Sequence, residues 1–186
     1  MEPQWIEFKE PHTLNNVKIY LRAVYDGNTW NDTPITKLEF FDKGGVVEPI
    51  EGLKATSSSE YPDDDHAYAA GNAVDGWLDT HWVEGGATGD GEWIDVDLGG
   101  SKHVKRFGIS TGFDTTDSFY AGANRAGSVT LTFSDGTSQR IKLQDKKGLQ
   151  VFDVDATTSR VKVTFGDIIK GKTSDDLYVG EVRFWQ

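Results

Sequence analysis

The segment from residue 72 to residue 82 reads NAVDGWLDTHW and contains side chains that could form a small site. Asp75 and Gly76 mark a tight turn, and Thr80 and Trp82 follow this turn at short spacing. The turn could supply a carboxylate and a hydroxyl to a ligand, although a loop aspartate can also do no more than cap its own turn. The elements around this segment decide between these two roles.

Charge and composition limit the classes of function. The chain has 186 residues, 30 of them acidic and 19 basic, and its formal net charge is -11. Such a charge opposes binding to the phosphate backbone of nucleic acids. No apolar run is long enough to span a membrane, and the first residues lack the pattern of a signal peptide. The absence of cysteine excludes disulfides and thiolate metal sites.

Short strands separated by turns are predicted along most of the chain. The sequence contains 21 glycines, and its apolar and polar residues alternate in short runs without a sustained helical stripe. This pattern predicts an all-β jelly-roll β-sandwich. The expected strands are residues 5–8, 17–21, 37–41, 92–98, 104–110, 128–133, 139–143, 150–154, 160–165 and 181–185.

An internal repeat suggests how the chain is divided. Residues 17–41 align without a gap with residues 161–185, and their apolar positions agree. We therefore predict the last strands of an incomplete copy over 1–43, a linker over 44–52 and a complete sandwich over 53–186. Three strands with an exposed apolar face could pack on the complete module, pair with a neighbouring chain, or be the remnant of a longer parent protein. Chance similarity between strands is the alternative.

One apparent nucleotide-binding motif is rejected. The segment GDIIKGKT, residues 166–173, satisfies the phosphate-loop pattern. Too few residues follow Thr173 to form the helix and parallel sheet that such a loop requires. We interpret the segment as a turn. The sequence also lacks a G-x-S-x-G elbow, an H-E-x-x-H motif and a cysteine nucleophile, so we do not expect an enzyme.

The complete module resembles a known family. Residues 54–186 resemble the discoidin superfamily of galactose-binding-like jelly rolls, in particular the bacterial NADase-type glycan-binding domain. The segments that carry this resemblance are NAVDGWLDTHWVEG, GDGEWIDVDL, NRAGSVTLTFSDGTSQRIKLQD and GKTSDDLYVGEVRFW. It implies a non-catalytic carbohydrate-binding module of a larger or cell-surface protein, located outside the cell. The alternative is an assembly module in which the incomplete repeat, residues 1–43, complements a neighbouring subunit.

The resemblance also implies a structural calcium site. In many discoidin-like lectins, the Asp-Gly loop and a C-terminal glutamate hold one calcium ion through side-chain and main-chain oxygens, the hard ligands that this ion prefers. Alternatively, Asp75 caps its turn and the glutamate is a surface residue. The expected ligands are the side chains of Asp75, Thr80 and Glu181 and the carbonyl groups of Asn72, Trp77 and Gly180.

Sugar-binding sites combine an aromatic face with planar polar groups. The resemblance places such residues on loops at one end of the sandwich. Arg125 and Glu84 could bind sugar together, or they could form an internal salt bridge between two loops. We expect Trp82 in the core. The expected glycan-binding residues are Glu84, Arg125, Asn124, Tyr120, Phe113 and His81.

Overall fold

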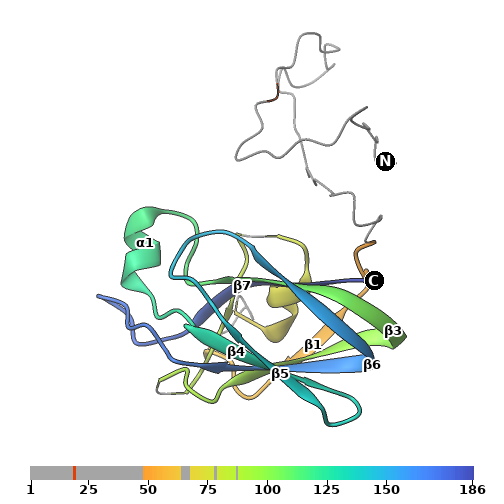
Figure 1. Cartoon of the computed structure of the whole chain (residues 1–186). Helices are drawn as coiled ribbons and strands as arrows, with labels where there is room; N and C mark the ends of the chain where they lie inside the picture. The colour runs from red at the N-terminus through yellow and green to blue at the C-terminus, as the bar shows by residue number, and fades with distance from the viewer. Residues whose placement is uncertain (1–18, 20–47, 64–67, 78, 87) are drawn as a thin grey trace, which may run out of the picture. The chain divides into compact units, whose positions relative to one another are not determined.

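Figure 1 shows the computed structural model of the chain, which describes residues 19, 48–63, 68–77, 79–86 and 88–186. The chain divides into two units, Met1–Val46 and Val47–Gln186, and the fold below is that of the second unit. The predicted incomplete repeat, residues 1–43, lies outside the described residues except for residue 19 and stays a prediction.

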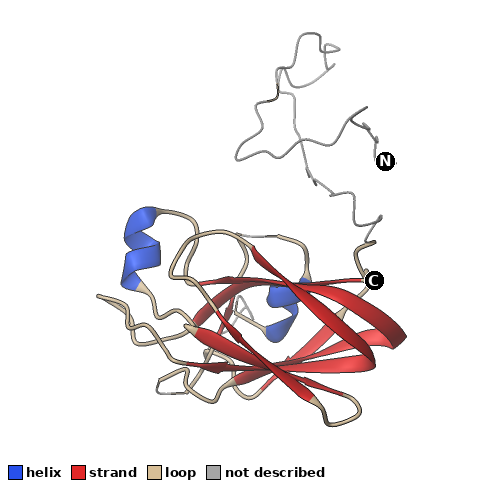
Figure 2. Cartoon of the chain, in the orientation of Figure 1, coloured by secondary structure: helices blue, strands red, loops and turns tan. Residues whose placement is uncertain are grey.

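The described residues of the second unit form mainly strands, which confirms the all-β prediction (Figure 2). A 3₁₀-helix, Ala70–Val74, precedes β2, and one short α-helix, α1 (Asp117–Gly122), follows β3. The strands are β1 (Lys54–Ser57), β2 (Trp82–Val83), β3 (Trp93–Thr111), β4 (Ser128–Phe133), β5 (Ser138–Lys142), β6 (Gln150–Gly166) and β7 (Tyr178–Trp185).

The strands pair in the order β2-β7-β3-β6-β4-β5, with β1 beside β3, and all these pairs are antiparallel. The long strands β3 and β6 each have two parts with different partners. The first part of β3 pairs with β1 and the last part pairs with β7. The β3–β6 register shifts between Asp97 and Lys102, where the strands bend. The bent strands belong to both layers of a jelly-roll sandwich, as the sequence predicts.

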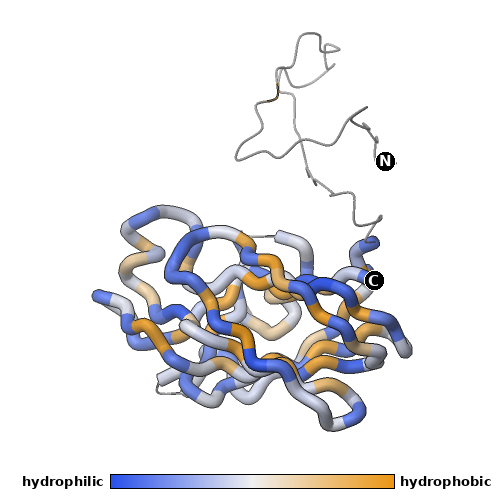
Figure 3. Tube along the Cα trace, viewed as in Figure 1, coloured by the Kyte–Doolittle hydropathy of each residue, from blue (hydrophilic) through white to orange (hydrophobic). Residues whose placement is uncertain are grey.

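The hydrophobic core follows from the alternation of residues along the strands, which Figure 3 shows as alternating colours. Trp82 is fully buried and its ring stacks on that of Phe165, with 5.5 Å between the centroids. The indole Nε1 of Trp82 donates a hydrogen bond to the Ser59 carbonyl at 3.0 Å. Trp82 therefore belongs to the core, as expected. The buried residues in the first part of β3 are Ile94, Val96 and Leu98.

The start of the described unit pairs with its C-terminal strand. The backbone N–H of Glu48 donates to the carbonyl of Gln186 at 3.2 Å, and that of Gln186 donates back at 2.9 Å. Ile50 is buried, and its N–H donates to the Phe184 carbonyl at 2.8 Å. Residues 48–50 belong to the segment that the sequence assigns to a linker, and they extend the sandwich along β7.

Several loops meet at one end of the sandwich. The last of them joins β6 to β7, contains most of the GDIIKGKT segment and has no helix among its residues, which agrees with its interpretation as a turn. This loop packs against α1, because Lys172 N–H donates to the Ala121 carbonyl at 3.1 Å. The meeting loops are residues 84–86 with 88–92, 112–127, 143–149 and 167–177.

Candidate functional site

Four aromatic side chains in contact lie at the loop end, and we call them the aromatic cluster: Phe119, Phe113, Tyr178 and His81. The Phe119 side chain of α1 is 54% exposed, and its ring stacks on Phe113 with 4.9 Å between the centroids. Phe113 also stacks on Tyr178 at 5.3 Å and 6°. His81 packs edge-on against Phe113 at 4.6 Å. The cluster therefore joins three separate segments and presents one ring to solvent.

Local hydrogen bonds hold the two phenylalanines in place. The helix that carries Phe119 begins after Thr116, whose hydroxyl accepts a hydrogen bond from the Phe119 N–H at 3.2 Å. Asp114, next to Phe113 in sequence, accepts hydrogen bonds from the Gly148 N–H at 2.6 Å and the Ser110 hydroxyl at 3.2 Å. The rings are thus held in position by the ordered backbone around them.

His81 is the polar member of the aromatic cluster. It is 3% exposed, and its Nε2 has no hydrogen-bond partner among the described residues. Burial lowers the pKa of His81, against the opposing effect of nearby carboxylates, chiefly that of Asp114. The imidazole is therefore mainly neutral at pH 7, and Nε2 is an unused hydrogen-bonding atom beside the rings.

Arg125 is held in an internal network. Its side chain is buried, and its Nε and Nη2 donate to the Asp145 carboxylate at 2.7 and 3.1 Å. Its Nη1 donates to the Tyr120 carbonyl at 3.1 Å, and the guanidinium lies 4.8 Å from the Tyr120 ring centroid. The Tyr120 hydroxyl also donates to Asp145, and burial raises the pKa of that hydroxyl. These contacts tie two loops together behind the aromatic cluster.

Asn124 also connects loops at this end of the sandwich. It is 1% exposed, and its side-chain amide donates to the Asp175 carbonyl. Its side-chain oxygen accepts a hydrogen bond from the Gly171 N–H at 2.8 Å. Both polar atoms of the amide therefore bind the loop between β6 and β7.

Glu84 is fully buried beside other carboxylates. Its Oε2 accepts a hydrogen bond from the Gly86 N–H, and its Oε1 has no hydrogen-bond partner among the described residues. Burial raises the pKa of Glu84, and the Glu92 carboxylate adds to this effect. Within the described structure, Glu84 forms no salt bridge with Arg125, which binds Asp145 instead. The internal salt bridge considered as an alternative from the sequence is therefore not formed.

The expected calcium ligands of the Asp-Gly loop do converge. The Thr80 hydroxyl lies 2.9 and 3.0 Å from the two oxygens of the Asp75 carboxylate. It also lies 3.0 Å from the Trp77 carbonyl and 3.5 Å from the Asn72 carbonyl. Asp75 accepts a hydrogen bond from the Trp77 N–H at 2.8 Å and so caps its turn as well. We call these four residues the oxygen cradle.

Glu181 approaches the same loop from β7. It is 1% exposed and is therefore not a surface residue. Arg183 links it to the loop, because the Arg183 side chain lies 3.7 Å from Glu181 Oε1 and donates to the Gly76 carbonyl at 3.0 Å. Gly180 precedes Glu181 and is buried. The donors of the cradle are all hard oxygens, which suits calcium. The described residues contain no group of three acidic or histidine side chains arranged for a metal, so main-chain carbonyls would have to complete this site.

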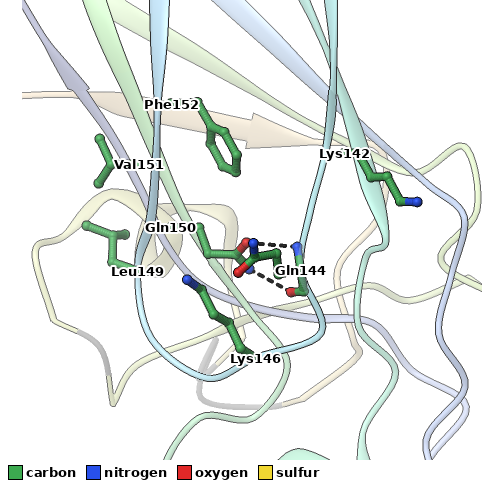
Figure 4. A pocket seen from close by; sticks show the side chains of 7 residues that line it. All are labelled: Lys142, Gln144, Lys146, Leu149, Gln150, Val151 and Phe152. Carbon is green, nitrogen blue, oxygen red and sulfur yellow. Dashed lines mark hydrogen bonds between the residues drawn. The ribbon is translucent and has the colours of Figure 1, made fainter. Parts of the chain in front are cut away.

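A shallow groove of about 390 Å³ lies beside the start of β6 (Figure 4). Gln144 and Gln150 hold its centre, because the Gln150 side chain exchanges hydrogen bonds of 2.9 and 2.8 Å with the Gln144 backbone. Lys142 stands at one edge with its ammonium group directed outward, and Lys146 stands at another. None of the residues expected from the sequence lines this groove.

The sequence did not single out two members of the aromatic cluster. Phe119 lies inside the loop segment from which Phe113 was chosen, and only its exposure on α1 distinguishes it. Tyr178 lies at the start of β7 and reaches Phe113 because β7 pairs with β3. No spacing along the chain predicts that contact, since it depends on the sheet topology.

Comparison with known proteins assigns the family. A family model described as the NAD glycohydrolase translocation F5/8 type C domain matches residues 46–185. The chain belongs to this family. Comparison with curated proteins gave no match. Among the described residues of this translocation-domain family member, no helix has both the length and the apolar character needed to cross a bilayer.

Solved structures share the fold. The family 32 carbohydrate-binding module of Clostridium perfringens NanJ, in complex with galactose, is 16% identical, with a TM-score of 0.56 over 74% of this chain and 96% of that chain. A module of Clostridium perfringens CpGH89, in complex with GalNAc-beta-1,3-galactose, is 19% identical, with a TM-score of 0.56 over 74% and 98%. A chitosan-binding module from Paenibacillus sp. IK-5 is 21% identical, with a TM-score of 0.56 over 75% and 99%. At these identities the similarity concerns the fold of this translocation-domain family member.

Proposed function

We propose that this domain is a non-catalytic glycan-binding module of a larger protein, and that it binds its ligand outside the cell. The observation that carries the proposal is the aromatic cluster, in which the exposed ring of Phe119 is stacked on Phe113 and Tyr178. A fixed aromatic face suits the apolar side of a sugar ring, and neighbouring polar groups can bind its hydroxyls. The complexes of similar modules with galactose and GalNAc-beta-1,3-galactose support this proposal.

The expected polar residues have different places in this proposal. His81 and Phe113 belong to the aromatic cluster, where the Nε2 atom of His81 is unused. Arg125, Asn124 and Tyr120 bind neighbouring loops. We therefore propose that these three residues position the loops, and that sugar contact is made mainly through the rings.

The test is retention of the whole chain on a glycan array and then on an affinity gel carrying galactose or GalNAc-beta-1,3-galactose. Phe119→Ala should weaken binding by about tenfold or more while leaving the fold intact, because the ring is exposed. Val151→Ala, which also removes an exposed apolar side chain, is the matched control and should bind normally. Unchanged retention of Phe119→Ala would contradict the proposal.

We also propose that the oxygen cradle, with Glu181, holds one structural calcium ion. The ion would supply positive charge to the Asp75 and Glu181 carboxylates, and the carbonyl groups of Asn72, Trp77 and Gly180 would complete its coordination. It would thereby fix the Asp-Gly loop to β7, which Arg183 already links to Gly76. Both carboxylate oxygens of Asp75 lie within 3.0 Å of Thr80 Oγ1. Asp75 is therefore the acidic side chain of the cradle.

The assembly function considered above depends on residues 1–43, of which the structure describes only residue 19. Light scattering of the whole chain over a range of concentrations tests it directly. Growth in mass with concentration would support pairing between subunits. A constant monomer mass would contradict it and leave the binding module as the function.

A further inference from the structure

A polar pocket lies on the sheet formed by β4, β5 and β6, apart from the aromatic cluster and the oxygen cradle. Its volume is about 340 Å³, within the range of small-ligand sites. The side chains of Thr130, Arg140 and Thr164 point to the outer face, because their strand neighbours Val129, Ile141 and Phe165 are buried in the core. The polar lining residues are Asp90, Ser128, Thr130, Arg140, Thr164 and Asp167.

An exposed ion pair forms one wall of this pocket. The Arg140 Nη2 donates to the Asp167 carboxylate at 2.8 Å and to the Ser128 hydroxyl at 3.3 Å. The Arg140 and Asp167 side chains are 65% and 60% exposed, so a ligand can reach both. The hydrogen bonds from Ser128 and Arg140 lower the pKa of Asp167, which keeps its carboxylate charged. The wall therefore offers planar donors and acceptors side by side.

Backbone conformation at the pocket is unusual. Asp167 has a φ of 52°, and it is the only non-glycine residue in the described part of the chain with a positive φ. Such conformations cost free energy and concentrate at functional sites. The lining also contains Gly91, whose φ of 82° places it in the same left-handed region. A Cβ atom at Gly166 would lie 3.3 Å from Ser128 Oγ and 3.7 Å from Asp90 Oδ1, so the absence of this side chain keeps the pocket open.

The charges and hydroxyls of the pocket define the ligand class. Asp90 and Asp167 outnumber Arg140 among the lining residues, while Lys142 also lies near enough to act on Asp167, and the net charge of -11 of the whole chain disfavours an anionic ligand. The alternating donors and acceptors match the adjacent hydroxyls of a neutral sugar. Trp93 pairs with Thr164 across β3 and β6, so the two side chains share the outer face of the sheet, where the Lys162 ammonium lies 4.1 Å from the centroid of the Trp93 ring.

We propose that this pocket is a second saccharide-binding site that accepts a neutral sugar unit. The inference goes beyond the proposed function, because the pocket shares no residue with the aromatic cluster and could bind independently of it. Arg140 and Asp167 would bind adjacent hydroxyls, and Ser128 and Thr130 would add hydroxyl contacts. Two sites on different faces would allow one domain to contact two parts of a polysaccharide.

The test is an NMR titration of the ¹⁵N-labelled whole chain with glucose, galactose, mannose and N-acetylglucosamine, each at millimolar concentrations. Glucuronate serves as the charged comparison. At least one neutral sugar should shift the backbone amide signals of Thr130, Thr164 and Asp167, and glucuronate should shift them less. Absence of these shifts with all four neutral sugars would overturn the proposal.

Two variants locate the binding. Gly166→Ala adds a methyl group inside the pocket without requiring an unusual φ, and it should abolish these shifts. Arg140→Ala should weaken binding by about tenfold or more. Arg160→Ala is the matched control, because Arg160 also forms an exposed ion pair, with Asp95, outside the pocket. Binding that is unchanged in Arg140→Ala and in a folded Gly166→Ala would overturn the proposal.

The Phe119→Ala variant separates this proposal from the first one. It should keep the shifts at the pocket while losing binding at the aromatic cluster. Sugar-induced shifts confined to Phe113, Phe119 and Tyr178 would remove the second site and leave the proposed function. Sugar-induced shifts confined to the pocket would support the second site and contradict the proposed function.

Discussion

Arg125 shows how burial changes the role of a charged side chain. A guanidinium on a loop is well suited to bind sugar hydroxyls, but here it faces inward and binds Asp145 and backbone carbonyls. Its donors are used inside the protein, and its removal would leave the carbonyl acceptors unpaired. The Arg125–Asp145 pair is consequently a stabilising contact between loops.

We predict that Arg125→Ala lowers the free energy of unfolding by about 2 kcal/mol or more, because several charge-assisted hydrogen bonds are lost from a buried side chain. Arg160→Ala, which breaks an exposed ion pair with Asp95, should cost much less. Urea unfolding of both variants measures the difference. Equal losses of unfolding free energy in the two variants would show that the burial of Arg125 adds nothing to stability.

We predict that the stability of the protein depends on pH through the buried carboxyl group of Glu84. Its folded-state pKa is raised by burial, so the folded protein binds its proton more tightly than the unfolded chain does. Stability from this group is present below the unfolded pKa of about 4.3 and is lost as the pH rises through the raised folded pKa. Glu84→Gln should therefore be more stable than the wild type near neutral pH, with the difference shrinking in acid.

Urea unfolding at a series of pH values measures this effect. Glu48→Gln is the control, because it makes the same change of side chain at an exposed position. A Glu84→Gln profile parallel to that of the wild type would show that Glu84 has the same proton affinity in the folded and unfolded chains.

At the level of secondary structure, the loop between β6 and β7 depends on very close backbone packing. A Cβ atom at Gly171 would lie 2.1 Å from the Gly122 carbonyl at the end of α1. Asn124 strengthens the same contact through its hydrogen bond from the Gly171 N–H. Since α1 carries Phe119, the position of the exposed ring depends on this glycine.

We predict that Gly171→Ala lowers the free energy of unfolding by about 1 to 3 kcal/mol, because backbone atoms must move to admit the methyl group. It should also weaken glycan retention by shifting α1. Gly71→Ala is the matched control, since nothing lies within 4 Å of its added Cβ, and its stability should change by less than about 0.5 kcal/mol. Urea unfolding and affinity retention test both effects. Identical behaviour of the two variants would contradict the prediction.

The elements were more predictable from the sequence than the site. Alternating residues predicted the strand segments 104–110, 128–133 and 160–165, because one face of each strand is buried in the core. The six-residue helix α1 was missed, since it is too short to show an apolar stripe. The ring contact between Phe113 and Tyr178 depends on strand pairing, so local sequence could not predict it.

At the level of the whole molecule, a bound ion at the oxygen cradle would act on the stability of the complete unit. The cradle joins the Asp-Gly loop to β7 through Arg183, and β7 pairs with β3 in the middle of the sheet order. A ligand that binds only the folded state raises its stability by mass action. Calcium should therefore raise the melting temperature of the whole chain.

We predict that Asp75→Ala removes this effect of calcium, so that its melting temperature is the same with calcium and with chelator. Asp135→Ala is the matched control. Asp135 also starts an Asp-Gly turn and accepts hydrogen bonds from the Thr137 N–H and hydroxyl, at 2.9 and 2.6 Å. Differential scanning calorimetry should show that Asp135→Ala keeps the response to calcium. A wild-type protein without any response would show that Asp75 serves only as a turn cap.

The sharing of β3 and β6 between both layers has a kinetic consequence. Trp93 pairs with Thr164 and Ile109 pairs with Gln150, so each layer needs contacts between segments far apart along the chain. Neither layer can form before these distant strand segments meet, and closing such long loops makes folding slow compared with that of helical domains. Because the same two strands cross from one layer to the other, the layers should also be lost together. A refolding experiment followed separately by Trp fluorescence and by circular dichroism should therefore give a single common rate.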